Sequence, residues 1–427
     1  MVSIAGIVAR RSAALPAAPL VVGFGWFAGK QQEGLWSVDW AMGSGQVNTA
    51  LLWPVALVAA IAAWDTSRMR RIDADVLERT YPRSGLAHLL LSGLPALLVG
   101  LLASAAALLA VATSMRGGGQ PLWDYLLVAE LMFVAATASG VAAGYVLPRY
   151  LAAPVVGIGL WLLLAYGSIS DNAYLRRLVG VDIECCAAAQ EPLVTTLAGQ
   201  GLWLVAVAIG AAAVLCWRRP RLAARVGALA VVVALAGLGF LHRGDARLLT
   251  ARQPSEAVCR TGSEVTVCLW PEHADQLPRW LSVAREYRAT FDALGPAPVL
   301  FAADGTRWSA PEAVPIGVIR PHQTDADLLE SLALSTVRQP PDCARIPSAQ
   351  PGVVSYGPYP ARAGQDLVAA WIRHQVRPHL PPRALGAPGR TAEVERLLAA
   401  PENAQRDWIA RAVRAGDDCT TPTPELP

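Results

Sequence analysis

The chain has 427 residues, of which 54% are hydrophobic, and its mean hydropathy is +0.36. This composition is too apolar for an ordinary soluble enzyme and too polar for a chain that lies in a membrane throughout. The formal net charge is only +3. It excludes a nucleic-acid-binding protein whose affinity depends on neutralising phosphates. Because the hydrophobic excess precedes residue 243, the sequence predicts a membrane domain, 1–242, and a second domain, 243–427.

The membrane domain contains seven apolar stretches. A helix needs about 20 apolar residues to cross the hydrocarbon core of a bilayer, and about 17 is the lower limit. The first and fifth stretches are the shortest and hold Pro or several Gly. The stretches run from Ala13 to Ala28, Val47 to Trp64, Leu86 to Thr113, Tyr125 to Leu147, Pro154 to Ile169, Leu197 to Trp217 and Val226 to Leu241. They predict an α-helical polytopic domain of about seven transmembrane helices in a plasma membrane.

The distribution of Arg and Lys between the short loops predicts the orientation, because cytoplasmic loops carry an excess of these residues. With a cytoplasmic N-terminus, the outer short loops contain only Lys30, Arg116, Arg176 and Arg177. The inner segments contain the larger set, Arg10, Arg11, Arg68, Arg70, Arg71, Arg79, Arg83, Arg149, Arg218, Arg219, Arg221 and Arg225. An odd number of spans then makes the second domain extracytoplasmic.

A cleavable signal peptide is the alternative for the first stretch. Arg10 and Arg11 precede an apolar run whose length suits the hydrophobic region of such a peptide. No convincing A-x-A cleavage site follows, and six further apolar stretches favour an ordinary first helix.

The cysteines agree with this orientation, because disulfides persist in oxidising compartments. Six of the seven fall on the predicted outer side: Cys185, Cys186, Cys259, Cys268, Cys343 and Cys419. Cys259 and Cys268 bracket a short segment that could be a disulfide-closed hairpin. Cys343 and Cys419 would tie a Pro-rich loop to the C-terminus. Spacing alone does not decide the connectivity, and Cys185 and Cys186 could instead be small buried residues.

The inner loop after the second stretch is the most patterned polar connection. Ile72, Val76 and Leu77 share one face of a helix, and charged residues lie largely opposite. The pattern predicts a short amphipathic helix at the membrane surface. Pro82 would end it.

This loop resembles that of actinobacterial ABC-2-type transporter permeases, in which an acidic residue and an Arg cluster lead into a short helix ending in Thr-x-Pro-Arg. The matching residues are Asp65, Arg68, Arg70, Arg71, Thr80, Pro82 and Arg83. In such permeases the helix docks on a cytoplasmic ATPase, so the resemblance implies a P-loop ATPase partner that contacts the helix bearing Val76 and Leu77. A solvated charged loop is the alternative reading.

The resemblance covers this loop and a six-span arrangement. A seventh span and a large C-terminal domain depart from the family pattern. The sequence contains no G-x-x-x-x-G-K-S/T motif, so energy from ATP would have to come from another polypeptide.

Glu130 is an ionisable residue inside the fourth stretch. Such residues are expensive in a membrane and usually face a partner or a cavity. At 1.5 Å per residue, Glu130 lies about 9 Å from Asp124. It is therefore either an acid with a substrate or proton role or a structural acid near the outer interface. Further along, Gly140 and Gly144 form a G-x-x-x-G step, which allows close helix packing within the chain or between two copies.

The second domain combines strand and helix patterns. Alternation predicts strands at Glu264 to Trp270, Val299 to Ala302 and Val314 to Ile319. Helical spacing predicts helices at Asp275 to Leu294, Asp325 to Thr336, Gln365 to Val376, Thr391 to Ala399 and Asn403 to Ala415. The sequence thus predicts a small α+β extracytoplasmic domain. The string from Val267 to His273, which includes Trp270, resembles a region of uncharacterised actinobacterial membrane proteins related to transporter permeases. This resemblance implies no activity.

No recognisable catalytic or metal motif occurs in this domain. Glu272 and His273 are adjacent, and neighbours one residue apart point in different directions on a helix. Neither H-E-x-x-H nor G-x-S-x-G is present. We therefore expect no enzyme activity, no cofactor and no metal.

These features favour the membrane-spanning subunit of an ABC-2-like transport complex. We expect a homodimer in the lipid bilayer that relies on a separate cytoplasmic ATPase and binds no nucleic acid. The alternative is a membrane-anchored extracytoplasmic binding or sensory module, although seven spans are many for an anchor. An integral membrane enzyme is less favoured, because no nucleophile, metal or carboxylate constellation lies in or near the spans.

Overall fold

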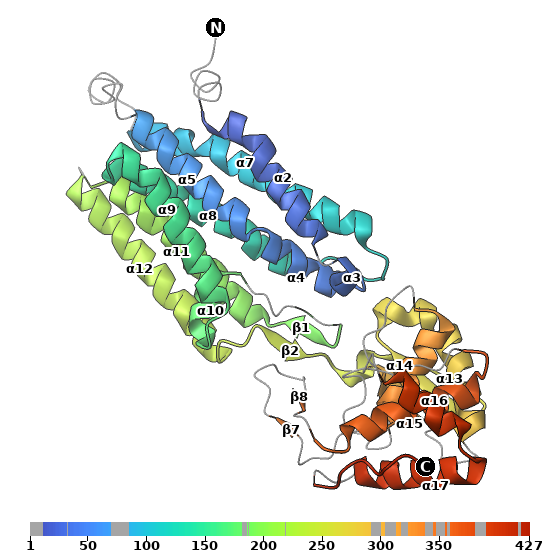
Figure 1. Ribbon diagram of the computed structural model, residues 1–427. Coiled ribbons are helices and arrows are strands. Elements are labelled where there is room, and N and C mark those ends of the chain that lie inside the picture. The colour runs from blue at the N-terminus through green and yellow to red at the C-terminus, as the bar shows by residue number, and fades with distance from the viewer. Residues whose placement is uncertain are drawn as a thin grey trace. The chain divides into compact units, whose positions relative to one another are not determined.

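The chain forms two compact units in a computed structural model (Figure 1). Unit 1 contains Met1–Ala187 and Glu191–Thr250, and unit 2 contains Ala188–Gln190 and Ala251–Pro427. The structure describes residues 12–31, 33–69, 85–181, 186, 188–217, 219–291, 300–303, 313–316, 323–337, 345–346, 355–356, 359–380, 390–416 and 420–427.

Unit 1 is a bundle of long helices. Its helices are α2 (Ala14–Lys30), α3 (Glu33–Trp36), α4 (Trp40–Ala50), α5 (Leu52–Met69), α7 (Gly85–Ser114), α8 (Trp123–Val146), α9 (Arg149–Ser168), α10 (Ala173–Val179), α11 (Val194–Leu215) and α12 (Pro220–Arg243). Figure 1 shows the long helices lying side by side. The predicted polytopic helical domain is therefore confirmed in outline.

Six helical segments of the described chain are long and apolar enough to cross a membrane. They are Trp40–Arg68, Ser92–Ser114, Trp123–Val146, Arg149–Ser168, Val194–Leu215 and Pro220–Arg243. The first predicted stretch is also helical, as α2, but has only 17 residues. Its length is about 26 Å at 1.5 Å per residue, slightly less than the hydrocarbon core. The described chain thus has six helices long and apolar enough to cross a membrane, one fewer than the predicted seven, and α2 is the shorter helix at the first predicted stretch.

Glycines let the backbones of α5 and α8 approach closely. A Cβ atom added to Gly140 would lie 2.3 Å from the carbonyl oxygen of Ala59, and one added to Gly144 would lie 2.3 Å from that of Ala63. No side chain tolerates such distances. The G-x-x-x-G step therefore packs α8 against α5 within the chain.

Two further helix pairs use the same device. A Cβ on Gly25 of α2 would lie 2.3 Å from the carbonyl oxygen of Ala103 in α7. Gly199 of α11 and Gly237 of α12 face each other, since a Cβ on either would lie 2.9 Å from the other's carbonyl oxygen. Small residues at such contacts are typical of helices that pack in a membrane.

Helices α9 and α12 are the most exposed of the long helices. In their most apolar segments, only 22% of α9 and 11% of α12 is buried inside the protein. Their exposed side chains include Leu151, Val155, Ile158, Val231, Val232 and Leu235. An apolar surface of this kind suits contact with lipid.

Unit 2 contains a four-stranded sheet in the order β3-β4-β5-β6. The strands are β3 (Val258–Gly262), β4 (Val265–Leu269), β5 (Leu300–Ala303) and β6 (Ala313–Ile316). β3 and β4 form an antiparallel hairpin, whereas β5 and β6 run parallel to β4. The three predicted strands are confirmed within a few residues, and β3 is an additional strand.

Five helices of the described chain contribute buried side chains to the core of unit 2. They are α13 (Leu277–Phe291), α14 (Asp325–Val337), α15 (Arg362–Val376), α16 (Thr391–Ala399) and α17 (Glu402–Gly416). All five were expected, although the first begins as the 3-10 helix η2 (Pro271–Gln276). Trp270, Trp280 and Trp408 are at most 2% exposed. The described residues also form two separate two-stranded sheets. They are β1 (Gln190–Pro192) with β2 (Leu249–Ala251), and β7 (Arg345–Ile346) with β8 (Ser355–Tyr356).

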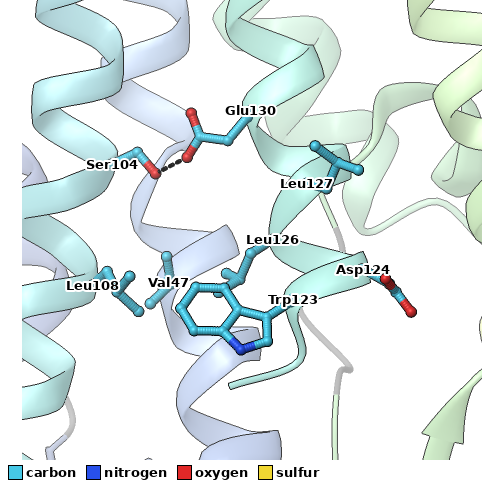
Figure 2. A pocket seen from close by; sticks show the side chains of 8 residues that line it. All are labelled: Val47, Ser104, Leu108, Trp123, Asp124, Leu126, Leu127 and Glu130. Carbon is cyan, nitrogen blue, oxygen red and sulfur yellow. Dashed lines mark hydrogen bonds between the residues drawn. The ribbon is translucent and has the colours of Figure 1, made fainter. Parts of the chain in front are cut away.

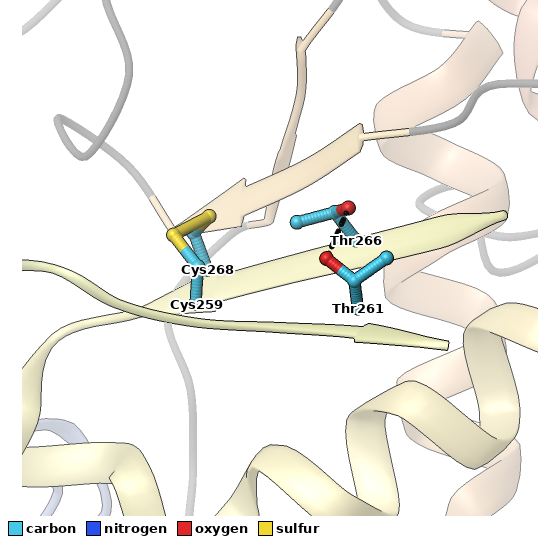
Figure 3. Close-up of a disulfide and its surroundings, with 4 residues drawn as sticks. All are labelled: Cys259, Thr261, Thr266 and Cys268. Atoms are coloured by element: carbon cyan, nitrogen blue, oxygen red, sulfur yellow. Dashed lines mark hydrogen bonds between the residues drawn. A yellow bond between two sulfur atoms is a disulfide. The ribbon is translucent and has the colours of Figure 1, made fainter.

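A disulfide joins the two strands of the hairpin. Cys259 and Cys268 are direct partners in the β3 and β4 register and are bonded to each other (Figure 3). Thr261 and Thr266 form a hydrogen bond of 2.9 Å between their hydroxyl oxygens on the same hairpin. The predicted disulfide-closed hairpin is confirmed.

The other cysteines are only partly described. Cys186 is disulfide-bonded, and its partner lies outside the described residues. Cys216, at the end of α11, is a buried free thiol. Cys185, Cys343 and Cys419 lie outside the described residues.

We predict that Gly140→Ala destabilises the protein, because its new methyl group must displace the α5 backbone. Overpacking of this kind costs about 1–3 kcal/mol, and thermal unfolding of the full chain in detergent would measure it. Gly159→Ala in α9 is the matched control, because nothing lies within 4 Å of a Cβ there. Equal melting temperatures for the two variants would contradict the close contact.

Candidate functional site

The residues that resemble the permease loop fall into two groups in the structure. Asp65 and Arg68 belong to α5 itself rather than to the loop that follows it. The others, Arg70, Arg71, Val76, Leu77, Thr80, Pro82 and Arg83, lie outside the described residues. The predicted amphipathic helix is therefore not described.

Asp65 is buried and binds the N-terminal end of α2. Its carboxylate accepts a hydrogen bond of 2.5 Å from the hydroxyl of Ser12, and bonds of 2.9 and 3.2 Å from the backbone N–H of Ala13. A carboxylate is favourable at this position because the start of a helix has unpaired N–H groups and a positive dipole end. Asp65 thus connects α5 to α2. Arg68 is exposed one turn later.

Helix α5 ends, and α9 and α12 begin, at the same end of unit 1 (Figure 1). This end contains several Arg residues. The guanidinium of Arg149 lies 5.2 Å from the ring centroid of Trp64 and 5.7 Å from that of Tyr150. Aromatic rings and Arg are common at the interface between membrane and water. The described basic residues at this end are Arg68, Arg149, Arg219, Arg221 and Arg225.

Glu130 lines a pocket between α4, α7 and α8. It projects from α8 towards α7, and one carboxylate oxygen, Oε1, accepts a hydrogen bond from the hydroxyl of Ser104 (Figure 2). The pocket has a volume of about 380 Å³. Its lining residues are Val47 from α4, Ser104 and Leu108 from α7, and Trp123, Asp124, Leu126, Leu127 and Glu130 from α8.

The second oxygen of Glu130, Oε2, accepts no hydrogen bond from the described residues. Oε2 is buried, and no donor in the described part of the chain lies within hydrogen-bonding distance. Leaving such an oxygen unpaired costs free energy, and more if the group is charged. Asp124 does not share this position, because Figure 2 shows its carboxylate pointing away from Glu130. Glu130 is therefore an acidic residue in an otherwise mostly apolar lining.

Sequence reasoning found Glu130 but not the residues around it. Ser104, Leu108 and Val47 carry no motif, and only the packing of α7 and α4 against α8 brings them to the acid. The sequence points to Asp65 because the segment that it begins resembles the permease loop. Its partner Ser12 lies 53 residues earlier, a separation that no local pattern reveals.

The polar cluster near Trp270 in unit 2 is occupied by ion pairs. Arg252 donates to Glu272 at 2.9 Å and to Glu256 at 3.0 Å, and its guanidinium lies 4.6 Å from the Trp270 ring centroid. Glu272, in the first turn of η2, therefore forms an ion pair with Arg252. Among the described residues, no group of three or more His, Cys, Asp or Glu could hold a metal ion.

One protein-family comparison places part of the chain. A model described as a domain of unknown function, DUF7224, matches residues 267–419. The match begins in β4 and ends just beyond α17, so it lies within unit 2 and includes none of the membrane helices. Neither the curated proteins nor the solved structures gave a match to this chain.

We predict that His273 makes stability depend on pH. Burial lowers the pKa of His273 below its ordinary value of 6.5, although Glu272 and Asp275 oppose this shift. The unfolded chain therefore takes up a proton near pH 6.5 that the folded chain does not bind. Stability is present above this pH and is lost below it, by up to about 1.4 kcal/mol per pH unit.

Urea unfolding of the full chain in detergent, followed between pH 8 and pH 5, would measure this loss. His273→Gln should flatten the pH dependence, whereas His379→Gln, at an exposed position, should leave it unchanged. The same slope in wild type and His273→Gln would refute the prediction.

Proposed function

We propose that the chain is the membrane-spanning subunit of an ABC-2-like transport complex that relies on a separate cytoplasmic ATPase. The observation that carries this proposal is the Glu130 pocket inside a multi-pass bundle. Helices that serve only as an anchor need no such cavity, whereas an ionisable residue that lines a cavity between spans often marks a substrate or ion pathway. The segment from Asp65 to Arg83 resembles the permease loop that docks on an ATPase. A separate ATPase would therefore supply the energy, since the sequence contains no P-loop of its own.

The proposed transporter has seven spans, with α2 as the first. Gly25 contacts α7 at Ala103, and Gly29 contacts it at Ala107, so the two helices run in the same direction. Lys30, at the end of α2, donates a hydrogen bond to Ser114 at the end of α7. The other end of α2 is bound by Asp65, near the end of α5. These contacts support α2 as a span, because a short apolar helix is accommodated by local thinning of the bilayer.

The proposed orientation has a cytoplasmic N-terminus and an extracytoplasmic unit 2. The basic end of the bundle, which holds Arg68, Arg149 and Arg219, favours the cytoplasm for that end. The disulfide between Cys259 and Cys268 favours an oxidising compartment for unit 2. With seven spans, these two assignments agree.

We predict that alkaline phosphatase fused after Pro427 is active in a bacterial host, because this enzyme matures only outside the cytoplasm. Green fluorescent protein at the same position should not fluoresce after export. Phosphatase fused after Leu147, at the end of α8, is the control and should be inactive. Cytoplasmic signals from the Pro427 fusions would exclude the proposed orientation.

We predict that a P-loop ATPase co-purifies with the tagged full chain in mild detergent. Changing both Arg70 and Arg71 to Ala should remove the ATPase, because these residues lie in the loop that resembles the coupling element. Changing Arg221 and Arg225 to Ala is the matched control, since it removes the same charge at the same end of the bundle. The proposal fails if no ATPase is recovered with the wild-type chain, or if both double variants lose it equally.

A membrane-anchored binding or sensory module is the second candidate. The compactness of unit 2, with its own aromatic core and a disulfide, supports it. In that case the ligand binds to unit 2 and the Glu130 pocket has no part in function. The two candidates therefore differ in the role of a single membrane acid.

A further inference from the structure

The charged residues that line the Glu130 pocket are all acidic. They are Glu130, which is directed inward, and Asp124, which lies at the margin. No Lys, Arg or His is among the described lining residues. An anionic ligand would meet like charge here without a compensating partner, whereas a cation would meet a carboxylate in a partly desolvated position. The pocket therefore suits a positively charged ligand.

The hydrogen-bonding groups of the pocket point to the same class of ligand. Ser104 donates its hydroxyl proton to Glu130, so this side chain offers a ligand only lone pairs. Figure 2 shows the indole nitrogen of Trp123 on the side of its ring that is away from Glu130. Oε2 of Glu130 is buried and without a donor in the described part of the chain. In Figure 2 this buried oxygen points away from the other lining residues, whereas Oε1 lies on their side and can accept a second hydrogen bond, from a ligand N–H group.

The rest of the wall is apolar. Val47, Leu108 and Leu126 lie below Glu130 in Figure 2, next to the ring of Trp123. The face of an indole ring attracts ammonium groups. A volume of about 380 Å³ is within the usual range for small-molecule sites. A bare metal ion fits less well, because it needs several oxygen ligands and only one carboxylate is directed inward.

We infer that the Glu130 pocket binds an amphipathic organic cation, with its ammonium group at Glu130 and its apolar body against Trp123, Val47 and Leu108. The inference rests on the proposed function in one respect, because it names the substrate class of that transporter. Binding itself needs no ATPase, so it can be measured on this chain alone.

Three probes with one apolar body test the inference: 4-phenylbutylamine, 4-phenylbutanol and 4-phenylbutyrate. Their binding to the full chain would be measured by calorimetry at pH 7, in nanodiscs of uncharged lipid so that the bilayer does not concentrate cations. The amine should bind roughly tenfold more tightly than the alcohol, since it pairs with a partly desolvated carboxylate. The carboxylate probe should bind more weakly than the alcohol. Equal affinities for all three would overturn the inference.

Glu130→Gln should reduce the amine's advantage over the alcohol from roughly tenfold to less than about twofold, because the amine then meets no charge. Glutamine keeps the shape of the side chain and an oxygen for the Ser104 hydroxyl, and measurable binding of the alcohol shows that the pocket is intact. Asp124→Asn removes the same charge at the margin and should alter amine affinity by less than about twofold, because its carboxylate points away from the site. An amine preference that survives Glu130→Gln would refute the assignment.

The binding result and the ATPase result fail separately. Amine binding that depends on Glu130, without any co-purified ATPase, would support the cation site and reject the transport complex. A co-purified ATPase, with amine binding indifferent to Glu130, would reject the cation site and support the complex.

Discussion

The contact between helix backbones at glycines is the constraint on which unit 1 depends. Lipid tails are as apolar as the helices, so burying apolar surface between helices contributes little free energy to their association in a bilayer. Van der Waals contact between closely packed helices must stabilise the bundle instead. Gly140 and Gly144 bring α8 onto the carbonyl groups of α5, and Gly25 brings α2 onto α7. A methyl group at any of these positions would lie only 2.3 Å from a backbone oxygen of the neighbouring helix. The arrangement of α2, α5, α7 and α8 therefore depends on residues that have no side chain.

The polar residues of the bundle depend on this packing. Asp65 reaches the start of α2 only because α2 lies close to the end of α5, and three hydrogen bonds then join the two helices. Ser104 reaches Glu130 only because α7 and α8 are neighbours. The two acids differ in what remains unpaired. Protein donors bind both oxygens of the Asp65 carboxylate, whereas Glu130 lines a pocket and, among the described residues, accepts a hydrogen bond from Ser104 alone. Glu130 is therefore the better candidate for function.

Unit 2 is held together by different interactions. Its core contains large aromatic residues, and some of its buried polar side chains are hydrogen-bonded within the unit. Gln405 shows this most clearly, because it accepts from the indole N–H of Trp371 and donates to the carbonyl groups of Leu398 and Ala400. A buried amide paired in this way fixes α17 against α15 and α16. The hairpin disulfide between Cys259 and Cys268 acts on the edge strand β3, whose side chains are mostly exposed.

The sequence by itself determined that most of the first 250 residues form long apolar helices and that a mixed helix and sheet unit follows, because hydropathy and periodicity are local properties. It also identified Glu130, the Gly140 step and the Cys259–Cys268 hairpin, each of which has a short-range signature. The tertiary structure alone decided that the glycine step packs within the chain, that Asp65 binds the start of α2, and that Ser104 and Trp123 join Glu130 around one pocket. These outcomes depend on contacts between helices far apart in sequence. They follow from which backbones can approach closely, and no single stretch of sequence encodes that.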